Sequence, residues 1–336
     1  MKLSILDQSP ISAGNTAGQA LQESMKLAQI GEQLGYERYW IAEHHDLPGL
    51  ACPAPEVMLG YIGANTDKIR IGSGAVLLPH YKPYKVAESF NLLATLFPGR
   101  IDIGIGRAPG GSAEASLALS ENYLEKVRKM PESVKELLQF LHNDFPDSHM
   151  FSKVAASPMP AVPPEPWILG TSEKSSLLAA ENGAAYAFGH FMSEKAGPEI
   201  MKNYKLSFQG KGRLARPKSI VAASVICAET TERAEEIALS GQLWQLQLAK
   251  GEGNQGVPSI QAAKEYSYSI EEKNTMESMK QKMVIGNPHE VKQKLVELQK
   301  QYQADEIMVI TITHRFEDRA NSYRLIADEQ LAVKQN

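Results

Sequence analysis

The residues best suited to chemistry lie in the run Tyr39–His45, where an apolar, strand-like stretch ends in an acid and two histidines. Glu43, His44 and His45 come directly before a Pro/Gly-rich turn. Ionisable groups at the end of a buried strand lie at the rim of a core, where partial burial tunes the pKa and tautomer of a histidine for proton transfer or ligand binding. A polar cap on the strand end is the plainer interpretation. Three such residues in a row, with polar clusters at other strand ends, favour an active site.

Two further polar clusters follow strand-like runs. Arg107 comes just after the apolar run Ile101–Ile105, and a turn that contains Thr171, Ser172 and Ser175 leads into a helical run. A helix N-terminus offers free backbone N–H groups and a positive dipole end, and a guanidinium at the same rim can clamp a phosphate. An ordinary N-cap and a salt bridge to a carboxylate are the structural alternatives. Together the two clusters predict a phosphate site.

Glycines interrupt two neighbouring strand-like runs, Gly72 and Gly74 in one and Gly104 and Gly106 in the next. A glycine inside a strand marks a bulge or a place where a ligand approaches the backbone closely. A flat aromatic cofactor against bare backbone and a bulge that curves a barrel are both open interpretations. The third glycine and the following helix of a dinucleotide-binding fingerprint are absent after Gly106.

A metal site is the less favoured use of the histidines. The sequence has no His-x-His or His-x-x-x-His spacing, and neighbouring residues on a strand point to opposite sides. We therefore predict no metal. The candidate ligands considered were Glu43, His44, His45, His80 and His190.

The elements that must position these residues alternate between short apolar runs and amphipathic helices. Eight strand-like runs bounded by Gly, Pro or charge, each followed by helical periodicity, predict a closed (β/α)8 TIM barrel rather than an open doubly wound sheet. In such a barrel the active site is built at the C-terminal ends of the strands. The runs are Leu3–Leu6, Arg38–Ala42, Ile69–Leu78, Ile101–Ile105, Trp167–Leu169, Ala184–Phe188, Ile220–Cys227 and Ile307–Ile312.

Two stretches break this rhythm. Residues 143–166 are rich in proline, and residues 251–275 are rich in Gly, Ser, Gln and Tyr, so both are expected to be loop insertions. Long loops in compact domains often act as lids, and 251–275 is the candidate lid. No linker divides the chain, so residues 1–336 are expected to form a single domain.

Composition narrows the class of protein. A chain of 336 residues that is 43% hydrophobic can bury a large core, and a net charge of −4 argues against a nucleic acid or an anionic membrane as the main partner. No apolar run reaches membrane-spanning length. Cys52 and Cys227 lie far apart and fit no metal spacing, which is typical of a cytoplasmic protein. Cys52 is close enough to the histidines to line the same site, although a small buried apolar role is favoured.

With these elements in place, the chain resembles the bacterial luciferase-like, flavin-dependent monooxygenase family along almost its whole length. Each motif alone is weak evidence, but the set is specific. The motifs are Trp40–His45, Ile69–Pro79, Pro83–Glu88, Leu96–Arg107, Arg107–Gly110 and Leu169–Ser172 with Ser175.

The resemblance implies a TIM barrel that binds reduced FMN at the strand ends. It implies a cis peptide bond between Gly74 and Ala75 that backs the flavin ring, and a phosphate held by Arg107 with Thr171, Ser172 and Ser175. His44 matches the family's catalytic histidine, and His190 is a second catalytic candidate on the substrate side. Gly106 stands where bacterial luciferase has a reactive thiol. This difference bears on light emission and leaves the implied flavin binding intact.

The activity implied is an EC 1.14-type oxygenation. Reduced FMN, supplied by a separate flavin reductase, would react with O2 to give a C4a-peroxyflavin that oxygenates a small organic substrate, in a protein expected to be a homodimer. His44 would exchange the proton, with Glu43 or a backbone carbonyl fixing its tautomer. The alternatives are an oxidoreductase of the same fold that uses F420 or flavin without oxygenation, and a non-catalytic flavin-binding protein.

Overall fold

Eight parallel strands close into a barrel, as the sequence predicts. The structure, a computed structural model, describes residues 1–193, 195–211 and 214–331. Each strand pairs in parallel with its neighbours, and the last strand pairs with both the first and the seventh, which closes the ring. The strands are β1 (Lys2–Asp7), β2 (Arg38–Ile41), β3 (Arg70–Ser73), β5 (Ile101–Gly106), β6 (Glu165–Gly170), β7 (Ala185–Gly189), β8 (Ser219–Cys227) and β10 (Glu306–Ile310).

Two short strands were not predicted. The expected run Ile69–Leu78 divides into β3 and β4 (Val76–Leu77), and both pair with β5. The division falls at the peptide bond between Gly74 and Ala75, which is cis, as the resemblance implies. The other addition, β9 (Val284–Gly286), pairs with the end of β8 beyond the closed ring.

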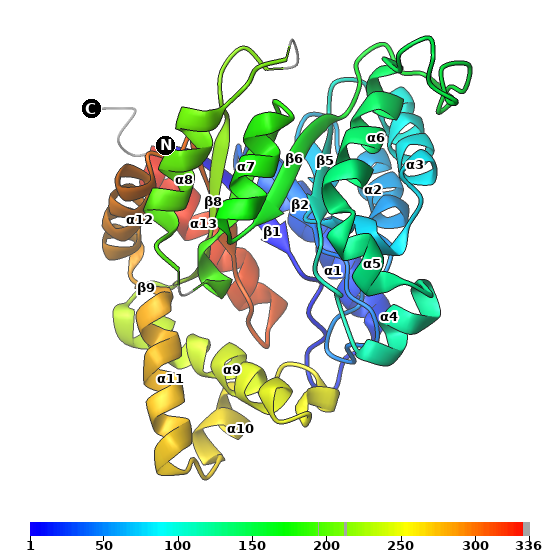
Figure 1. The fold of residues 1–336 in the computed structure, drawn as a ribbon. Helices are drawn as coiled ribbons and strands as arrows, with labels where there is room; N and C mark the ends of the chain where they lie inside the picture. Colours follow the sequence, from blue (N-terminus) through cyan, green and yellow to red (C-terminus); the bar gives the residue numbers. More distant parts are fainter. Residues whose placement is uncertain (194, 212–213, 332–336) are drawn as a thin grey trace.

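Helices surround the barrel (Figure 1). Those on the outside of the ring bury apolar faces against the strands. They are α1 (Ala17–Gln33), α2 (Pro55–Ala64), α3 (Pro83–Leu96), α6 (Met130–His142), α7 (Glu173–Glu181), α8 (Gly197–Ser207), α12 (Pro288–Tyr302) and α13 (Phe316–Leu331). Between β5 and α6 come α4 (Ala113–Leu119) and α5 (Tyr123–Arg128). None of the helices in the described ranges is long and apolar enough to cross a membrane.

Residues 251–275 are not the loop that their composition predicts. They form the short 3-10 turn η3 (Gly253–Gln255), α10 (Ile260–Glu265) and the first part of α11 (Ile270–Lys282). Ser259 and Ser269 begin the two helices by accepting hydrogen bonds at their hydroxyl oxygens, and Ser269 forms a capping box with Glu272. With α9 (Thr231–Ala249), these helices gather at the bottom of the view in Figure 1, beyond the ends of the strands.

The other expected insertion, residues 143–166, is a loop for most of its length and lies away from these helices. Residues 143–164 contain no helix or strand, and they pack on the outside of the barrel rather than over its mouth. The Phe145 ring packs edge-on against Phe140 of α6, and the Phe151 ring packs against Phe140 at a tilt. The Asn91 side-chain amide donates to the carbonyl oxygen of Ala156 at 2.7 Å. These contacts tie the segment to α3 and α6.

The barrel interior is filled at its N-terminal end. Trp40 and Trp167 pack edge to face inside the ring, and Arg38 beneath them donates to Asp102 at 2.7 Å and to Glu306 at 2.8 Å. Burial alone would raise the pKa of Asp102, but the neighbouring arginines lower it, so the carboxylate stays charged. Because this end holds packed rings and paired charges, a ligand must enter from the opposite end.

Candidate active site

A cavity of about 440 Å³ opens at the C-terminal ends of the strands. Its volume is in the range of small-molecule and cofactor sites. Much of its wall is apolar and comes from Leu6, Leu77, Leu169 and Phe191. The structure brings seven of the eight sequence-predicted site residues to this one cavity: His44, Gly74, Ala75, Arg107, Thr171, Ser172 and Ser175.

His44 lies just beyond β2, with its ring on the cavity wall. Its backbone N–H donates to the carbonyl oxygen of Cys52 at 3.0 Å, which fixes the chain as it leaves the strand. Its Nδ1 atom is buried and has no hydrogen-bond partner in the part of the chain that the structure describes. Burial, with a smaller contribution from the nearby His45, lowers the pKa of His44 to about 4. The imidazole is therefore neutral near pH 7 and can accept a proton.

Glu43, the residue before His44, forms its hydrogen bonds with groups other than His44. Glu43 accepts a hydrogen bond from the backbone N–H of Leu77 at 3.0 Å and from the Tyr81 hydroxyl at 2.8 Å, and it lies 2.7 Å from Nε2 of His45. Glu43 makes no hydrogen bond to His44 within the described ranges, so of the two groups expected to fix the His44 tautomer, Glu43 or a backbone carbonyl, Glu43 is not the one. Glu43 instead ties β4, which forms part of the cavity wall, to the end of β2.

The lowered pKa of His44 predicts a pH-dependent stability. In the unfolded chain His44 takes up a proton near its ordinary pKa of 6.5, whereas in the folded protein it does so only near 4. The stability contribution is therefore complete above pH 6.5 and is lost as the pH falls toward 4. Between pH 7.5 and pH 5, we expect His44→Gln to lose about 2 kcal/mol less unfolding free energy than the parent protein. Urea unfolding at the two pH values measures this difference, and equal losses in both proteins would contradict it.

Arg107 projects from the end of β5 at the mouth of the cavity. Its backbone carbonyl accepts a hydrogen bond from the Tyr123 hydroxyl at 2.8 Å, which joins the strand end to α5. Its guanidinium has no ion pair or hydrogen bond with any residue that the structure describes. The salt bridge that was the structural alternative for Arg107 is therefore absent from the described ranges, and the charge is available to an anion.

The turn after β6 places the N-terminus of α7 on the same cavity. Ser172 is the N-cap, and its hydroxyl oxygen accepts from the backbone N–H of Ser175 at 3.3 Å. Ser175 donates its own hydroxyl proton to the Ser172 carbonyl at 2.7 Å, so that proton is already used in the cap. The first N–H groups of a helix have no intrahelical acceptor, and they carry the positive end of its dipole. The N-cap interpretation is thus correct, and the capped helix end lines the same cavity as Arg107.

All four of the glycines that interrupt the two strand-like runs are closely packed, and two of them also line the cavity. A Cβ atom on Gly104 would lie 2.0 Å from the carbonyl oxygen of Ser73, and one on Gly72 would lie 2.7 Å from Cβ of Asp102, so both serve close packing between strands. Gly74 and Gly106 line the cavity and are closely packed as well, since a Cβ atom on Gly74 would lie 2.5 Å from Cδ1 of Leu6 and one on Gly106 would lie 2.9 Å from Cβ of Ala75. Together with Ala75 they present a wall of backbone and one methyl group, which a flat ring can approach.

His190, the second catalytic candidate, does not line this cavity. It begins the 3-10 turn η2 (His190–Met192), and its Nδ1 atom lies 2.9 Å from the hydroxyl oxygen of Tyr302 on α12. Burial lowers its pKa as well. The next two residues, Phe191 and Met192, are the ones that reach the cavity.

The comparisons with known proteins agree with this arrangement. Residues 1–304 match the family model described as luciferase-like monooxygenase. The chain belongs to the luciferase-like monooxygenase family. A relative in Bacillus subtilis (strain 168), named N-acetyl-S-alkylcysteine monooxygenase, is 37% identical over 335 residues and covers 99% of each chain.

Solved structures of the luciferase-like monooxygenase fold cover the chain from end to end. The crystal structure of apo-MsnO8 superimposes with a TM-score of 0.87 at 32% identity and covers 98% of both chains. The oxygenating constituent of 3,6-diketocamphane monooxygenase from Pseudomonas putida, solved in complex with FMN, has a TM-score of 0.71 at 19% identity. It covers 98% of this chain and 97% of its own, and at that identity it shows the fold alone.

One cavity residue was missed at the sequence level, and the role favoured for Cys52 is confirmed. Gln8 follows β1 directly and lines the cavity, so reading the first strand end by the rule used for the others would have found it. Cys52 is buried and does not line the cavity, and burial raises its thiol pKa to about 12. It is the small buried residue that the sequence favours, and its carbonyl holds His44 in place.

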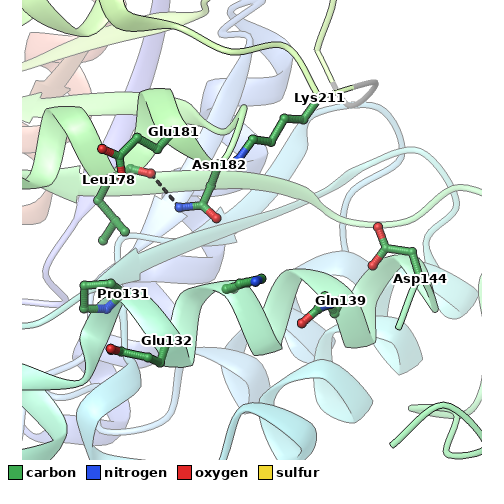
Figure 2. Close-up of a pocket in the computed structure, with 9 residues that line it drawn as sticks. Pro131, Glu132, Gln139, Asp144, Leu178, Glu181, Asn182 and Lys211 are labelled. Carbon is green, nitrogen blue, oxygen red and sulfur yellow. Dashed lines mark hydrogen bonds between the residues drawn. The ribbon is translucent and has the colours of Figure 1, made fainter. Parts of the chain in front are cut away.

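A cavity on the outside of the barrel offers no comparable site. Figure 2 shows it between α6 and α7, where the Asn182 side-chain amide donates to the carbonyl oxygen of Leu178 at 2.9 Å. Most of its lining is exposed, and it carries both signs of charge in Glu132, Glu181 and Lys211. None of the strand-end residues lies there. Among the described residues, no three His, Cys, Asp or Glu side chains come together so as to hold a metal ion.

Proposed function

We propose that this protein is an FMN-dependent monooxygenase that uses reduced FMN and O2 to oxygenate a small organic substrate. The observation that carries the proposal is a single cavity lined by a guanidinium without a partner among the described residues, by a helix N-terminus and by a neutral histidine. These residues fit FMN because the nucleotide has a dianionic phosphate, a polar ribityl chain and a flat ring. The FMN complex of the fold neighbour from Pseudomonas putida supports the choice of cofactor.

The phosphate would be held by Arg107 and the N-terminus of α7, with Thr171 and Ser172 as further donors. Ser175 would contribute through the cap, because its proton bonds the Ser172 carbonyl. The ring would lie against the backbone of Gly74 and Ala75. Reduced flavin supplies the activation of O2, and the protein supplies placement and a dry site.

His44 would exchange a proton with the reacting groups. Its pKa of about 4 keeps the ring neutral across the physiological range, so it begins each turnover able to accept a proton. The apolar side chains of Leu6, Leu77 and Leu169 would limit the access of water. His44 has no partner at Nδ1 among the described residues, which leaves that atom for a ligand or an ordered water.

The proposal implies partners beyond the substrate. A separate flavin reductase would supply reduced FMN, as the family resemblance implies, and a relative from Acinetobacter baylyi that is 23% identical is named the oxygenase component of a flavin-dependent trigonelline monooxygenase. A homodimer, the state that the family resemblance implies, remains part of the proposal. The cytoplasm would supply the reduced flavin.

Anaerobic titration with reduced FMN, followed by mixing with ¹⁸O2-saturated buffer, tests the proposal. We expect saturable binding of reduced FMN and the appearance of one ¹⁸O atom in an added organic compound, found by mass spectrometry of a substrate panel. Tight FMN retention with only hydrogen peroxide released across the panel would indicate a non-catalytic flavin-binding protein. Binding of reduced F420 in preference to FMN would indicate an oxidoreductase without oxygenation.

A further inference from the structure

The segment that carries Arg107 has no helix or strand of its own. Residues 107–110 follow β5 and line the cavity, and the first three of them are exposed to solvent. The guanidinium of Arg107 has no ion pair or hydrogen bond with any described residue, so the protein fixes its position only through the backbone that carries it. Whatever holds residues 107–110 therefore also places the group proposed to bind the FMN phosphate.

Three carbonyl oxygens of this segment accept hydrogen bonds from other parts of the barrel, those of Arg107, Pro109 and Gly110. The first accepts from the Tyr123 hydroxyl on α5 at 2.8 Å, and the second lies 2.9 Å from Nε2 of His80. The third accepts from the backbone N–H of His45 at 2.8 Å. An exposed segment is thus anchored at three points by donors from three elements.

His80 supplies one of these anchors from a buried position. It ends the 3-10 turn η1 (Leu78–His80), and it is only 4% exposed. Because a carbonyl oxygen can only accept, Nε2 of His80 must carry a proton to bond Pro109. Nδ1 of the same ring is buried and has no hydrogen-bond partner among the described residues. The bond to Pro109 is therefore the one hydrogen bond that this imidazole makes within the described ranges.

The His80 ring also supports the anchor on Arg107. It stacks on the Tyr123 ring, with 5.0 Å between the centroids and 23° between the planes, and the His45 ring packs against it edge-on at 5.6 Å. A Tyr123 ring that rests on a buried imidazole keeps its hydroxyl directed at the carbonyl oxygen of Arg107. His80 thus holds the segment directly at Pro109 and through Tyr123 at Arg107.

We propose that His80 is a positioning residue for the FMN phosphate. It does not line the cavity, and it acts by holding residues 107–110 so that the Arg107 guanidinium faces the ligand. The proposal rests on the proposed function, since it assigns a further residue to the same phosphate site. A guanidinium must meet a phosphate in the plane of its donors to make two hydrogen bonds, so a small shift of this backbone lowers affinity for the phosphate and not for the ring.

Fluorescence titrations of oxidised FMN and of riboflavin test this role. His80→Phe keeps a ring against Tyr123 and removes the donor to Pro109, so we expect it to weaken FMN about fivefold or more and riboflavin by less than about twofold. His80→Gln keeps an amide donor in place of Nε2, so it should bind FMN more tightly than His80→Phe. Unchanged FMN affinity in His80→Phe, equal losses of the two flavins, or no gain in His80→Gln would each overturn the proposal.

The same substitution in an Arg107→Ala background separates action through Arg107 from a general loss of stability. Without the guanidinium, His80→Phe should change FMN affinity by less than about twofold. Tyr123→Phe keeps the ring on His80 and loses only the hydroxyl that bonds Arg107, so it should show the same dependence on Arg107 with a smaller loss. Tyr123 is only half-buried, so this variant also decides the matter if His80→Phe does not fold. Losses of the same size with and without Arg107 would overturn the proposal.

His149 provides the matched control. Its ring stacks on Phe145, with 4.6 Å between the centroids and 24° between the planes, much as His80 stacks on Tyr123. It lies in the segment outside the barrel, away from the cavity. His149→Phe should therefore leave the affinities for FMN and riboflavin unchanged. A loss of FMN affinity as large as that of His80→Phe would overturn the proposal.

Cleavage by trypsin without flavin measures the anchoring itself. In His80→Phe, cleavage at the Arg107–Ala108 bond should be about threefold faster or more than in the parent protein, relative to cleavage at the exposed Lys153–Val154 bond. Unchanged cleavage would overturn the proposal even if FMN binds normally. If FMN does not bind the parent protein, the proposed function fails, and faster cleavage would still identify His80 as the residue that holds Arg107.

Discussion

Replacing His44 by alanine is expected to reduce the rate of product formation by roughly 10²–10⁴ while FMN affinity stays within a few fold. The ring lines the cavity, and its pKa of about 4 keeps it ready to accept a proton. Its Nδ1 atom has no partner among the described residues, so its removal breaks no hydrogen bond at that atom. Stopped-flow kinetics with the substrate found in the ¹⁸O experiment give the rate, and quenching of FMN fluorescence gives the affinity.

A second histidine variant serves as the control for this prediction. His190→Ala removes an imidazole that bonds Tyr302 and does not line the cavity, so product formation should stay close to that of the parent protein. A catalytic role for His44 also predicts that His44→Gln, which keeps a polar group of similar size, fails to restore the rate. If His44→Ala instead lost FMN affinity and kept the same yield of product per FMN oxidised, His44 would be a binding residue.

Most of the barrel follows from the sequence because each of its strands is a short apolar run with a clear stop. β5, for example, is fully buried, and Arg107 follows it directly. Two kinds of element were not predicted from the sequence. β9 has three residues, too few for any periodicity. α11 buries none of its side chains, so it has no apolar stripe and its composition looks like a loop. Its capping box, Ser269 with Glu272, was the one available signal.

The clustering of His44, Arg107 and the α7 N-terminus was predictable because parallel strands in a barrel bring their C-terminal ends together. The direction in which individual side chains point was harder to predict from the sequence. The turn η2 carries Phe191 and Met192, not His190, to the cavity, and nothing in the local sequence specifies that rotation. The pairing of Glu43 with His45 was available in principle, because residues two apart on an extended chain point to the same side. The three-way bonding of Glu43 required the position of β4, which the sequence does not give.

Replacing Arg107 by alanine should weaken FMN binding by about 10–100-fold and leave riboflavin binding nearly unchanged. The two flavins share the ring and the ribityl chain and differ only in the phosphate. Arg107 has no ion pair with any described residue, so its substitution removes a partner of the ligand without leaving a protein carboxylate unpaired. Fluorescence quenching titrations of both flavins against both proteins measure the effect, and FMN affinity in the parent protein should fall more steeply with salt than in the variant.

Long-range charge must be separated from direct contact in this test. Arg128→Ala, on the exposed surface of α5, makes the same change in net charge away from the cavity and should alter FMN affinity by less than about twofold. Arg107→Lys keeps the charge but loses the planar fork of donors, so an intermediate FMN affinity is expected if the phosphate accepts two hydrogen bonds from the guanidinium. Equal losses of FMN and riboflavin in Arg107→Ala would instead place Arg107 against the ring or the ribityl chain. The phosphate would then depend on the α7 N-terminus alone, and the observation that carries the proposed function would fail.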